Sequence, residues 1–111
     1  MASNFKLYVK PNIGTSNSTI YNPQTANIQS TIIGLTLCNT ANTPVEASLF
    51  LVQSSSSNTV FLLKEALVPV GSSIVPIGGD QKVVMSANDT LRVYSNTASS
   101  IDATLSVLEL T

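Results

Sequence analysis

The sequence predicts an all-β protein: an antiparallel β-sandwich of about eight short strands, whose connections are compatible with a jelly roll. Apolar and polar residues alternate with a period of two in one stretch after another. These stretches recur at intervals of about 8–12 residues, and turns rich in Asn, Ser, Gly and Pro separate them. No stretch has apolar residues spaced three and four apart over the length of a helix.

The stretch 31–52 is the strongest element, and the others are expected to pack around it. Its two halves alternate strictly on either side of the segment 39–44, which is rich in Asn and Thr and ends in proline. This arrangement predicts an antiparallel hairpin with one buried face. The side chains predicted to face the core are Ile33, Leu35, Leu37, Val45, Ala47, Leu49 and Leu51.

Two segments of different character precede this hairpin. Residues 5–10 alternate apolar and polar side chains and predict a short strand, which Pro11 ends. Residues 12–27 are rich in Asn, Ser and Thr, and they predict an extended arm or loop with room for a short strand at 18–22. An arm of this length, without a core of its own, could be ordered against a neighbouring subunit.

Shorter strands are predicted after the hairpin. An apolar run spans 60–63, and prolines break 66–77 into two pieces that belong at sheet edges. Residues 82–85 are strand-like, and the turn at 87–89 follows them. Within this turn, Asn88 suits a left-handed backbone conformation.

A second hairpin is predicted at the end of the chain, where 90–95 pairs with 101–110. Its turn begins with Asn-Thr-Ala at 96–98, and the turn of the first hairpin begins with the same residues at 39–41. In both, an acidic residue follows on the outer face and an apolar series on the inner face. We interpret this similarity as the same type of turn used in both hairpins.

The chain has 111 residues, which suits a single domain over 1–111 with one hydrophobic core. Hydrophobic residues make up 43% of the sequence but charged residues only 10%, against about 25% in an average soluble protein. The surface must therefore consist largely of Ser, Thr and Asn. Such a surface has little electrostatic self-repulsion and is compatible with extensive packing against neighbours.

Composition argues against several classes of function. The five basic residues are scattered and the formal net charge is −1, so no basic surface for nucleic acid is expected. The chain has no histidine, and its six acids form no recognisable catalytic or metal-binding pattern. The longest apolar runs are far too short to span a membrane. We therefore expect no enzyme, no cofactor, no nucleic-acid partner and no membrane partner.

The single cysteine bears on where the protein is made. Cys38 cannot form a disulfide within one chain, which suits a reducing compartment. The residues after Met1 lack the apolar run of a signal peptide. We therefore expect synthesis in the cytoplasm.

An apolar strip is predicted on the outer face of the central hairpin. Alternation puts Ile32, Phe50 and Val52 on the side away from the core, among Thr and Ser. Apolar strips of this kind mark subunit contacts, so we expect a homo-oligomer, with a trimer as the first choice. The alternative is that the arm 12–27 of the same chain covers the strip.

The pair Arg92 and Tyr94 defines an alternative function. Both alternate outward on one predicted strand, where a ring beside a guanidinium could contact a ligand. Because β-sandwiches often bind sugars on a face or loop, the alternative is a carbohydrate- or receptor-binding module. The simpler interpretation is a sheet face that lies under a neighbouring subunit.

Several turns and strand ends resemble those of a known group of proteins. These motifs are Pro69-Val70-Gly71-Ser72-Ser73, Ile77-Gly78-Gly79-Asp80-Gln81-Lys82-Val83-Val84, Asn88-Asp89-Thr90-Leu91-Arg92-Val93 and Ser106-Val107-Leu108-Glu109-Leu110-Thr111. Together with residues 35–40, they resemble small decoration or tail-associated virion proteins of tailed bacteriophages, in particular those of cyanophages. The resemblance implies a non-enzymatic structural protein of the virion that assembles with itself and docks on a major capsid or tail protein.

Overall fold

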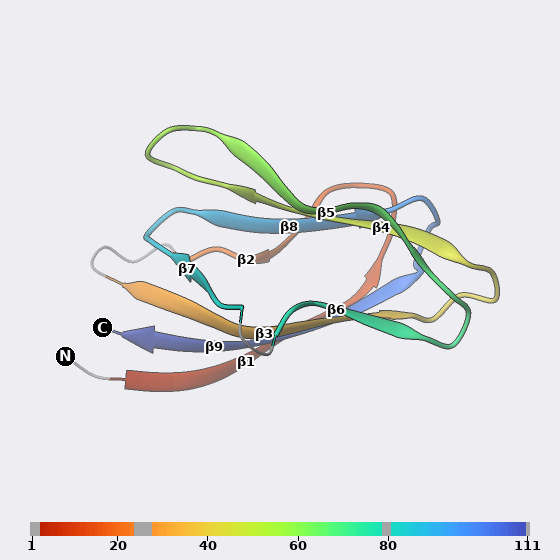
Figure 1. The fold of residues 1–111 in the computed structure, drawn as a ribbon, viewed down its shortest axis with the longest axis horizontal. Coiled ribbons are helices and arrows are strands. Elements are labelled where there is room, and N and C mark those ends of the chain that lie inside the picture. The colour runs from red at the N-terminus through yellow and green to blue at the C-terminus, as the bar shows by residue number, and fades with distance from the viewer. Residues whose placement is uncertain (1–2, 24–27, 79–80, 111) are drawn as a thin grey trace.

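The computed structural model describes residues 3–23, 28–78 and 81–110, and every regular element within them is a β-strand. Nine strands form two antiparallel sheets that pack face to face as a sandwich (Figure 1). The predicted fold class is confirmed, with nine strands in place of about eight. The strands are β1 (Ser3–Ile13), β2 (Ser18–Tyr21), β3 (Gln29–Asn39), β4 (Val45–Val52), β5 (Thr59–Val68), β6 (Ser73–Ile77), β7 (Val83–Met85), β8 (Thr90–Ser95) and β9 (Ile101–Leu110).

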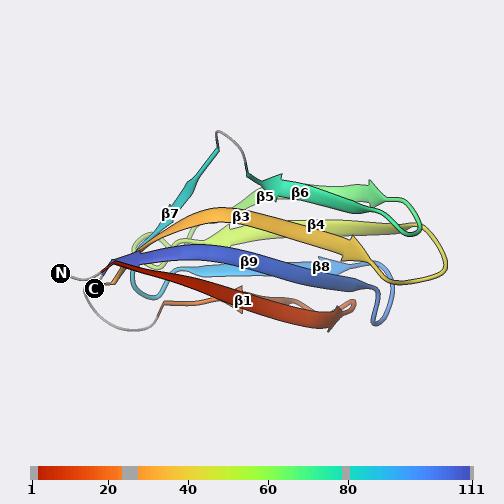
Figure 2. The same cartoon turned by 90° about the horizontal axis from the view of Figure 1, so that it is seen from below.

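The strand order is that of a jelly roll. Sheet A has the order β1-β9-β3-β6, with β7 also pairing with β3, and sheet B has the order β2-β8-β4-β5. The antiparallel pairs β1–β9, β2–β8, β3–β6 and β4–β5 are nested along the chain and alternate between the sheets. Figure 2 shows β5 and β6 together on one side of the sandwich and β1 on the opposite side.

Neither predicted hairpin is a pair of neighbouring strands. β3 pairs with β9, β6 and β7, whereas β4 pairs with β5 and β8, so the turn after β3 crosses from sheet A to sheet B. β8 and β9 lie in opposite sheets in the same way. The hairpin predictions were wrong because alternation identifies strands and their faces but not their partners. In a jelly roll, consecutive strands often lie in opposite sheets.

The repeated Asn-Thr-Ala segments form two corners between the sheets. At the first, the buried Asn39 donates from Nδ2 to the carbonyl oxygens of Thr43 and Val68, each at 3.0 Å. At the second, the exposed Asn96 accepts the N–H of Glu46 through Oδ1 at 3.0 Å. The two corners therefore share a starting sequence, and in each the asparagine amide contacts the backbone.

A β-bulge in β3 changes which residues face the core. Ile32 lies opposite Val107 of β9 and Gly34 lies opposite Ser106, so β3 has one more residue than β9 between these pairs. The extra residue, Ile33, reverses the alternation. Ile32 is fully buried and Ile33 only partly, so the predicted outward position of Ile32 and inward position of Ile33 are wrong.

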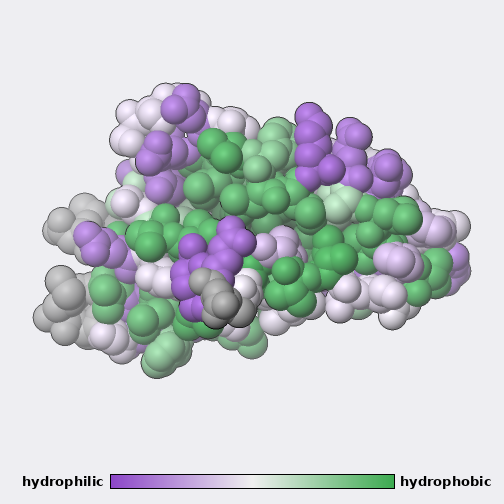
Figure 3. All heavy atoms as spheres, viewed as in Figure 1, coloured by the Kyte–Doolittle hydropathy of each residue, from purple (hydrophilic) through white to green (hydrophobic). Residues whose placement is uncertain are grey.

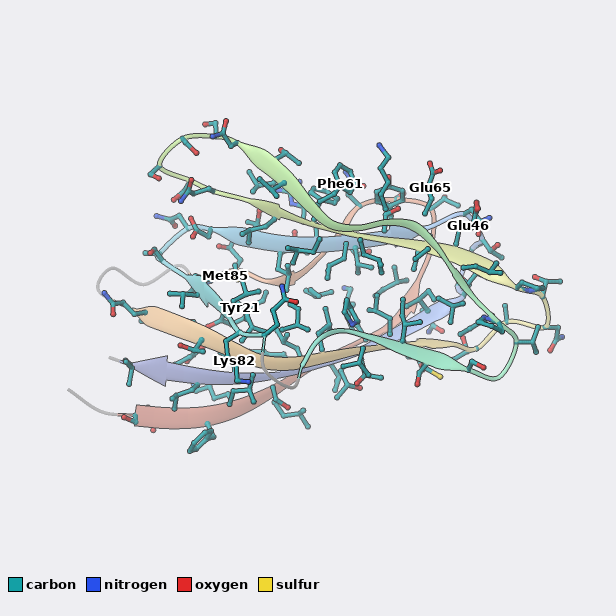
Figure 4. All side chains as sticks on the ribbon, viewed as in Figure 1. Tyr21, Glu46, Phe61, Glu65, Lys82 and Met85 are labelled. Atoms are coloured by element: carbon teal, nitrogen blue, oxygen red, sulfur yellow. The ribbon has the colours of Figure 1, made fainter. Side chains whose placement is uncertain are left out.

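One hydrophobic core fills the space between the sheets, and strands of both sheets contribute side chains to it. Tyr21 and Met85 lie between the two layers (Figure 4). The predicted inward residues other than Ile33 pack in or against this core. Its fully buried large side chains are Ile13, Ile32, Leu35, Leu37, Val45, Leu49, Val68, Ile77, Met85, Leu91, Ile101 and Leu105.

The described part of the predicted arm belongs to the sandwich itself. β1 continues to Ile13, and β2 pairs with β8 of the same chain. Ile13, Ile20 and Tyr21 bury their side chains in the core. The described part of this segment therefore closes one side of its own sandwich, while residues 24–27 lie outside the described residues.

Candidate functional site

The outer face of sheet B carries a hollow over three neighbouring strands. Cross-strand partners share a face, and the register places Arg92 of β8, Phe50 of β4 and Phe61 of β5 in one row. The hollow has a volume of about 570 Å³. We call it the outer hollow, and its lining residues are Asn17, Phe50, Val52, Thr59, Phe61, Arg92 and Tyr94.

Three aromatic rings form the apolar part of the outer hollow. The ring centroid of Phe50 lies 5.2 Å from that of Phe61 and 6.2 Å from that of Tyr94. Phe50 is only 6% exposed, whereas Phe61 is 39% exposed and lies on the side of sheet B away from sheet A (Figure 4). Tilted and edge-on ring pairs add about 0.5–1.5 kcal/mol each beyond their buried area. Phe50 therefore forms the base of the outer hollow, and Phe61 and Tyr94 pack against it at the sides.

Positive charge gathers at the outer hollow. The Arg92 guanidinium has no hydrogen bond or ion pair to any described residue, and its Nε is buried. The Nζ of Lys64 lies 4.7 Å from the ring centroid of Phe61, in a cation–π contact. None of the described lining residues is acidic. A buried donor thus faces a surface that supplies no carboxylate.

Four of the five predicted site residues come together in the outer hollow. Phe50 and Val52, predicted as subunit contacts, line it beside Arg92 and Tyr94, predicted as ligand contacts. Ile32 does not join them, because the bulge in β3 of sheet A turns its side chain into the core between the two sheets. The predicted strip of Ile32, Phe50 and Val52 is therefore not continuous, and its described outward members belong to the outer hollow.

The sequence prediction missed an exposed apolar surface on β1. Phe5, Leu7 and Val9 are 77%, 65% and 66% exposed, and their partners on β9 show that they face outward from sheet A. We call these three residues the apolar row. Alternation predicted the strand but not its orientation, and the inner face carries polar residues such as Tyr8, which hydrogen-bonds Glu109.

More apolar surface lies on the side where β5 and β6 approach each other. Val60, Leu67 and Val75 are each more than half exposed, and Figure 3 shows apolar surface running along this side. The strand edges here are irregular, because β5 has two register shifts and a φ of 51° at Glu65, and β6 contains Pro76. This side therefore offers apolar side chains without a regular backbone edge.

A buried carboxylate and its hydrogen-bonded partners join four strands. Glu109 of β9 is 4% exposed, and its Oε2 accepts the hydroxyl of Tyr21 at 2.6 Å and that of Tyr8 at 3.0 Å. Its Oε1 lies 3.1 Å from the Nζ of Lys6. The Tyr21 oxygen is also 2.6 Å from the Oγ of Ser30, which donates because Tyr21 gives its one proton to Glu109. We call these five residues the Glu109 cluster.

The Glu109 cluster favours the charged carboxylate. Burial acts to raise the pKa of Glu109, but hydrogen bonds from Tyr21, Lys6 and Tyr8, with the charge of Lys6, outweigh it and place this pKa below its ordinary value. Burial, followed by the hydrogen bond to Glu109, raises the pKa of Tyr21 and of Tyr8. The hydrogen bond to Glu109 raises the pKa of Lys6. The cluster therefore consists of several donors around one carboxylate acceptor, an arrangement that suits a role in stabilising the fold.

Other kinds of site are absent from the part of the chain that the structure describes. It holds no group of three or more His, Cys, Asp or Glu that could bind a metal ion. It also contains no helix with the length and apolar character needed to cross a membrane. A further hollow of about 420 Å³ lies beside the Glu109 cluster, but there Lys6 and Glu109 already pair with each other.

No protein-family model and no curated protein matches this sequence. A protein of Bacillus endospore appendages, described as a novel family of disulfide-linked pili, has a similar structure with a TM-score of 0.57 and 14% identity. That alignment covers 99% of this chain and 87% of the pilus protein. A pentameric capsid protein from metagenomic phage sequences aligns with a TM-score of 0.43 and 19% identity, over 95% of this chain and 60% of that one. Both neighbours are structural proteins, and the first supports the two-sheet fold.

Proposed function

We propose that this protein is a non-enzymatic structural subunit of a tailed-phage virion, which associates with itself through β1 and docks on a capsid or tail protein. The observation that carries this proposal is the apolar row on an unpaired strand edge. β1 has 11 residues, stands at the edge of sheet A, and pairs with β9 alone among the described strands. Its other edge is free to accept a strand from another chain.

The remaining sheet edges are poor partners for another chain. β2 has four residues and β7 has three, β6 contains Pro76, and the pairing of β5 is interrupted by register shifts. Short, bulged and proline-containing edges are the features that prevent pairing between molecules. From Ser3 to Lys10, β1 has none of them, because its pairing with β9 is continuous.

A second copy of β1 fits this edge in an antiparallel arrangement. With Leu7 opposite the second copy's Leu7, Phe5 lies opposite Val9, and Lys6 lies opposite Tyr8. No lysine then faces another lysine, and apolar pairs of this kind contribute about 0.2–1 kcal/mol each. The contact is twofold and closed, so it favours a dimer over the trimer expected from the sequence.

Pairing through β1 leaves the outer face of sheet A available for a larger surface. Phe5 lies beside Leu108 of β9, and the two add to the apolar character of this face. The virion step is supported by the resemblance of the turns and strand ends to small phage virion proteins. We place the mature protein in the virion, after synthesis in the host cytoplasm.

The self-association step is tested with two matched leucine variants. Leu7 of β1 is 65% exposed and Leu67 of β5 is 62% exposed. Light scattering at tens of micromolar should give an oligomer for the wild type and for Leu67→Asp, but a folded monomer for Leu7→Asp. A wild-type monomer would refute the step, and dissociation by Leu67→Asp alone would move the contact to the side of β5 and β6.

The virion step is tested on purified particles. We expect mass spectrometry to find this chain at a constant ratio to the major capsid protein after density-gradient purification. Loss of the chain from the particle fraction, with recovery in the soluble lysate, would contradict a structural role in the virion. Mild dissociation of capsids from tails then assigns it to one of them.

A further inference from the structure

The outer hollow has the features of a ligand site, and its position separates it from the proposed self-association edge. It lies on the outer face of sheet B, whereas the apolar row lies on sheet A. Its volume of about 570 Å³ is within the range of about 300–1,000 Å³ found for small-molecule pockets. Its lining combines aromatic rings with polar groups in about equal measure.

The polar groups of the outer hollow point to an anion with paired oxygens. Arg92 carries five N–H donors, and none of them has a partner among the described residues. A buried Nε without an acceptor is costly, and a ligand carboxylate relieves this cost by accepting from two guanidinium nitrogens in one plane. Lys64, held over the ring of Phe61, adds to the positive potential.

The apolar groups favour a sugar as the body of the ligand. Phe61 and Tyr94 stand around Phe50, and the negative face of an aromatic ring attracts the C–H groups of a pyranose. Asn17 and Thr59 at the rim, with the Tyr94 hydroxyl, can bond sugar hydroxyls. We propose that the outer hollow binds a sugar unit that bears a carboxylate, such as a uronic or sialic acid.

A peptide strand is a weaker fit to the same place. Strand addition requires a regular edge, and the adjacent edge belongs to β5, whose pairing with β4 shifts register twice. Glu65 has a φ of 51°, which further interrupts the extended backbone of that edge. The outer hollow lies on the face of sheet B, where a ligand would meet side chains and not the backbone N–H and C=O groups of a strand edge.

The test uses defined sugars and the full chain. We would titrate methyl glucuronide, N-acetylneuraminic acid, methyl glucoside and acetate, and follow the backbone amides and the Arg92 Nε–H by NMR. At least one acidic sugar should bind with a Kd on the order of 1 mM. Methyl glucoside lacks the carboxylate and acetate lacks the sugar ring, so each should bind about 10-fold more weakly. The two acidic sugars distinguish a uronic from a sialic source.

Matched variants locate the site. Arg92→Ala should weaken binding of the acidic sugar about 10-fold or more, and Phe61→Ala should weaken it without abolishing the preference for the acid. Lys10→Ala removes a cation on β1 of sheet A, which is not among the lining residues of the outer hollow, and should leave binding unchanged. Equal binding of acetate, unchanged binding by Arg92→Ala, or no saturation by either acidic sugar at about 10 mM would each overturn the proposal. So would a change of oligomeric mass in Arg92→Ala, because it would make the hollow a subunit contact.

Discussion

At the scale of single residues, Glu109 of β9 is a buried acid on which side chains from several strands converge. Its donors come from β1 and β2, and Ser30 of β3 supports one of them through Tyr21. These contacts hold the pKa of Glu109 below its unfolded value, which is about 4.3 for a free glutamate. A lowered folded-state pKa stabilises the protein above the unfolded pKa, and this stability is lost as the pH falls through the folded pKa.

We therefore predict that acid destabilises the wild type through Glu109. Urea unfolding should show the free energy of unfolding falling as the pH drops from about 5 to about 3, with a smaller fall in Glu109→Gln. At pH 7 the variant should be less stable by about 1–3 kcal/mol, because buried donors lose a charged acceptor. Asp89 contributes with the same sign, because hydrogen bonds from Ser54 and Ser86 outweigh burial and lower its pKa.

An exposed acid provides the control for this prediction. Glu65→Gln changes the net charge by the same amount at an exposed position. If Glu65→Gln reduced the acid-dependent loss as much as Glu109→Gln, the effect would be one of net charge, and the Glu109 cluster would not be its source.

At the scale of elements, the corners between the sheets depend on asparagine side chains. The Asn39 amide donates to the backbone of its own corner and to the end of β5, and its Oδ1 accepts the N–H of Ala41 at 2.8 Å. We predict that Asn39→Ala lowers the free energy of unfolding by about 2–4 kcal/mol, because several buried groups lose partners together. Asn96→Ala, at the exposed corner, should cost about 1 kcal/mol or less. Equal losses in thermal or urea unfolding would show that burial of the first corner does not matter.

These corners also show why some elements could be predicted and others could not. Alternation identified most strands and their faces, and Asn88 has the expected left-handed φ of 70°. Asn-Thr-Ala followed by an alternating strand is the same pattern in a hairpin turn and in a corner between sheets, so the partners of β3 and β8 were not predictable. The bulge at Ile33 leaves no mark on the alternation, and for that reason the sequence misplaced Ile32.

The same limit explains the outcome for the candidate sites. Phe50, Val52, Arg92 and Tyr94 could be placed on outer faces because their strands alternate without a bulge at these positions. That they share one hollow depends on the pairing of β4 with β8, which is a long-range contact. The orientation of β1 depends on the buried Glu109, whose attraction for Lys6 and Tyr8 turns the polar face inward and the apolar row outward.

At the scale of the whole molecule, the two proposed functions use opposite faces of the sandwich. Figure 1 shows the two sheets as separate layers. The apolar row lies at the edge of sheet A, and the outer hollow lies on the outer face of sheet B, with the hydrophobic core between them. A subunit paired through β1 would therefore keep its outer hollow exposed. Such an arrangement allows a surface protein to be held in an assembly on one side while its other side meets a ligand.

We predict that self-association and sugar binding are thermodynamically independent. Each side chain that acts in one process lies on the far side of the core from the other, so no shared contact is available to couple them. Leu7→Asp should abolish the dimer and leave the Kd for the acidic sugar within about 2-fold of the wild type. Arg92→Ala should weaken sugar binding and leave the dimer intact. The measurement is the sugar titration repeated on monomer and dimer, with light scattering on the same samples. A change of about 10-fold in Kd on dissociation would mean that the faces communicate through the sandwich or that the copies meet at sheet B.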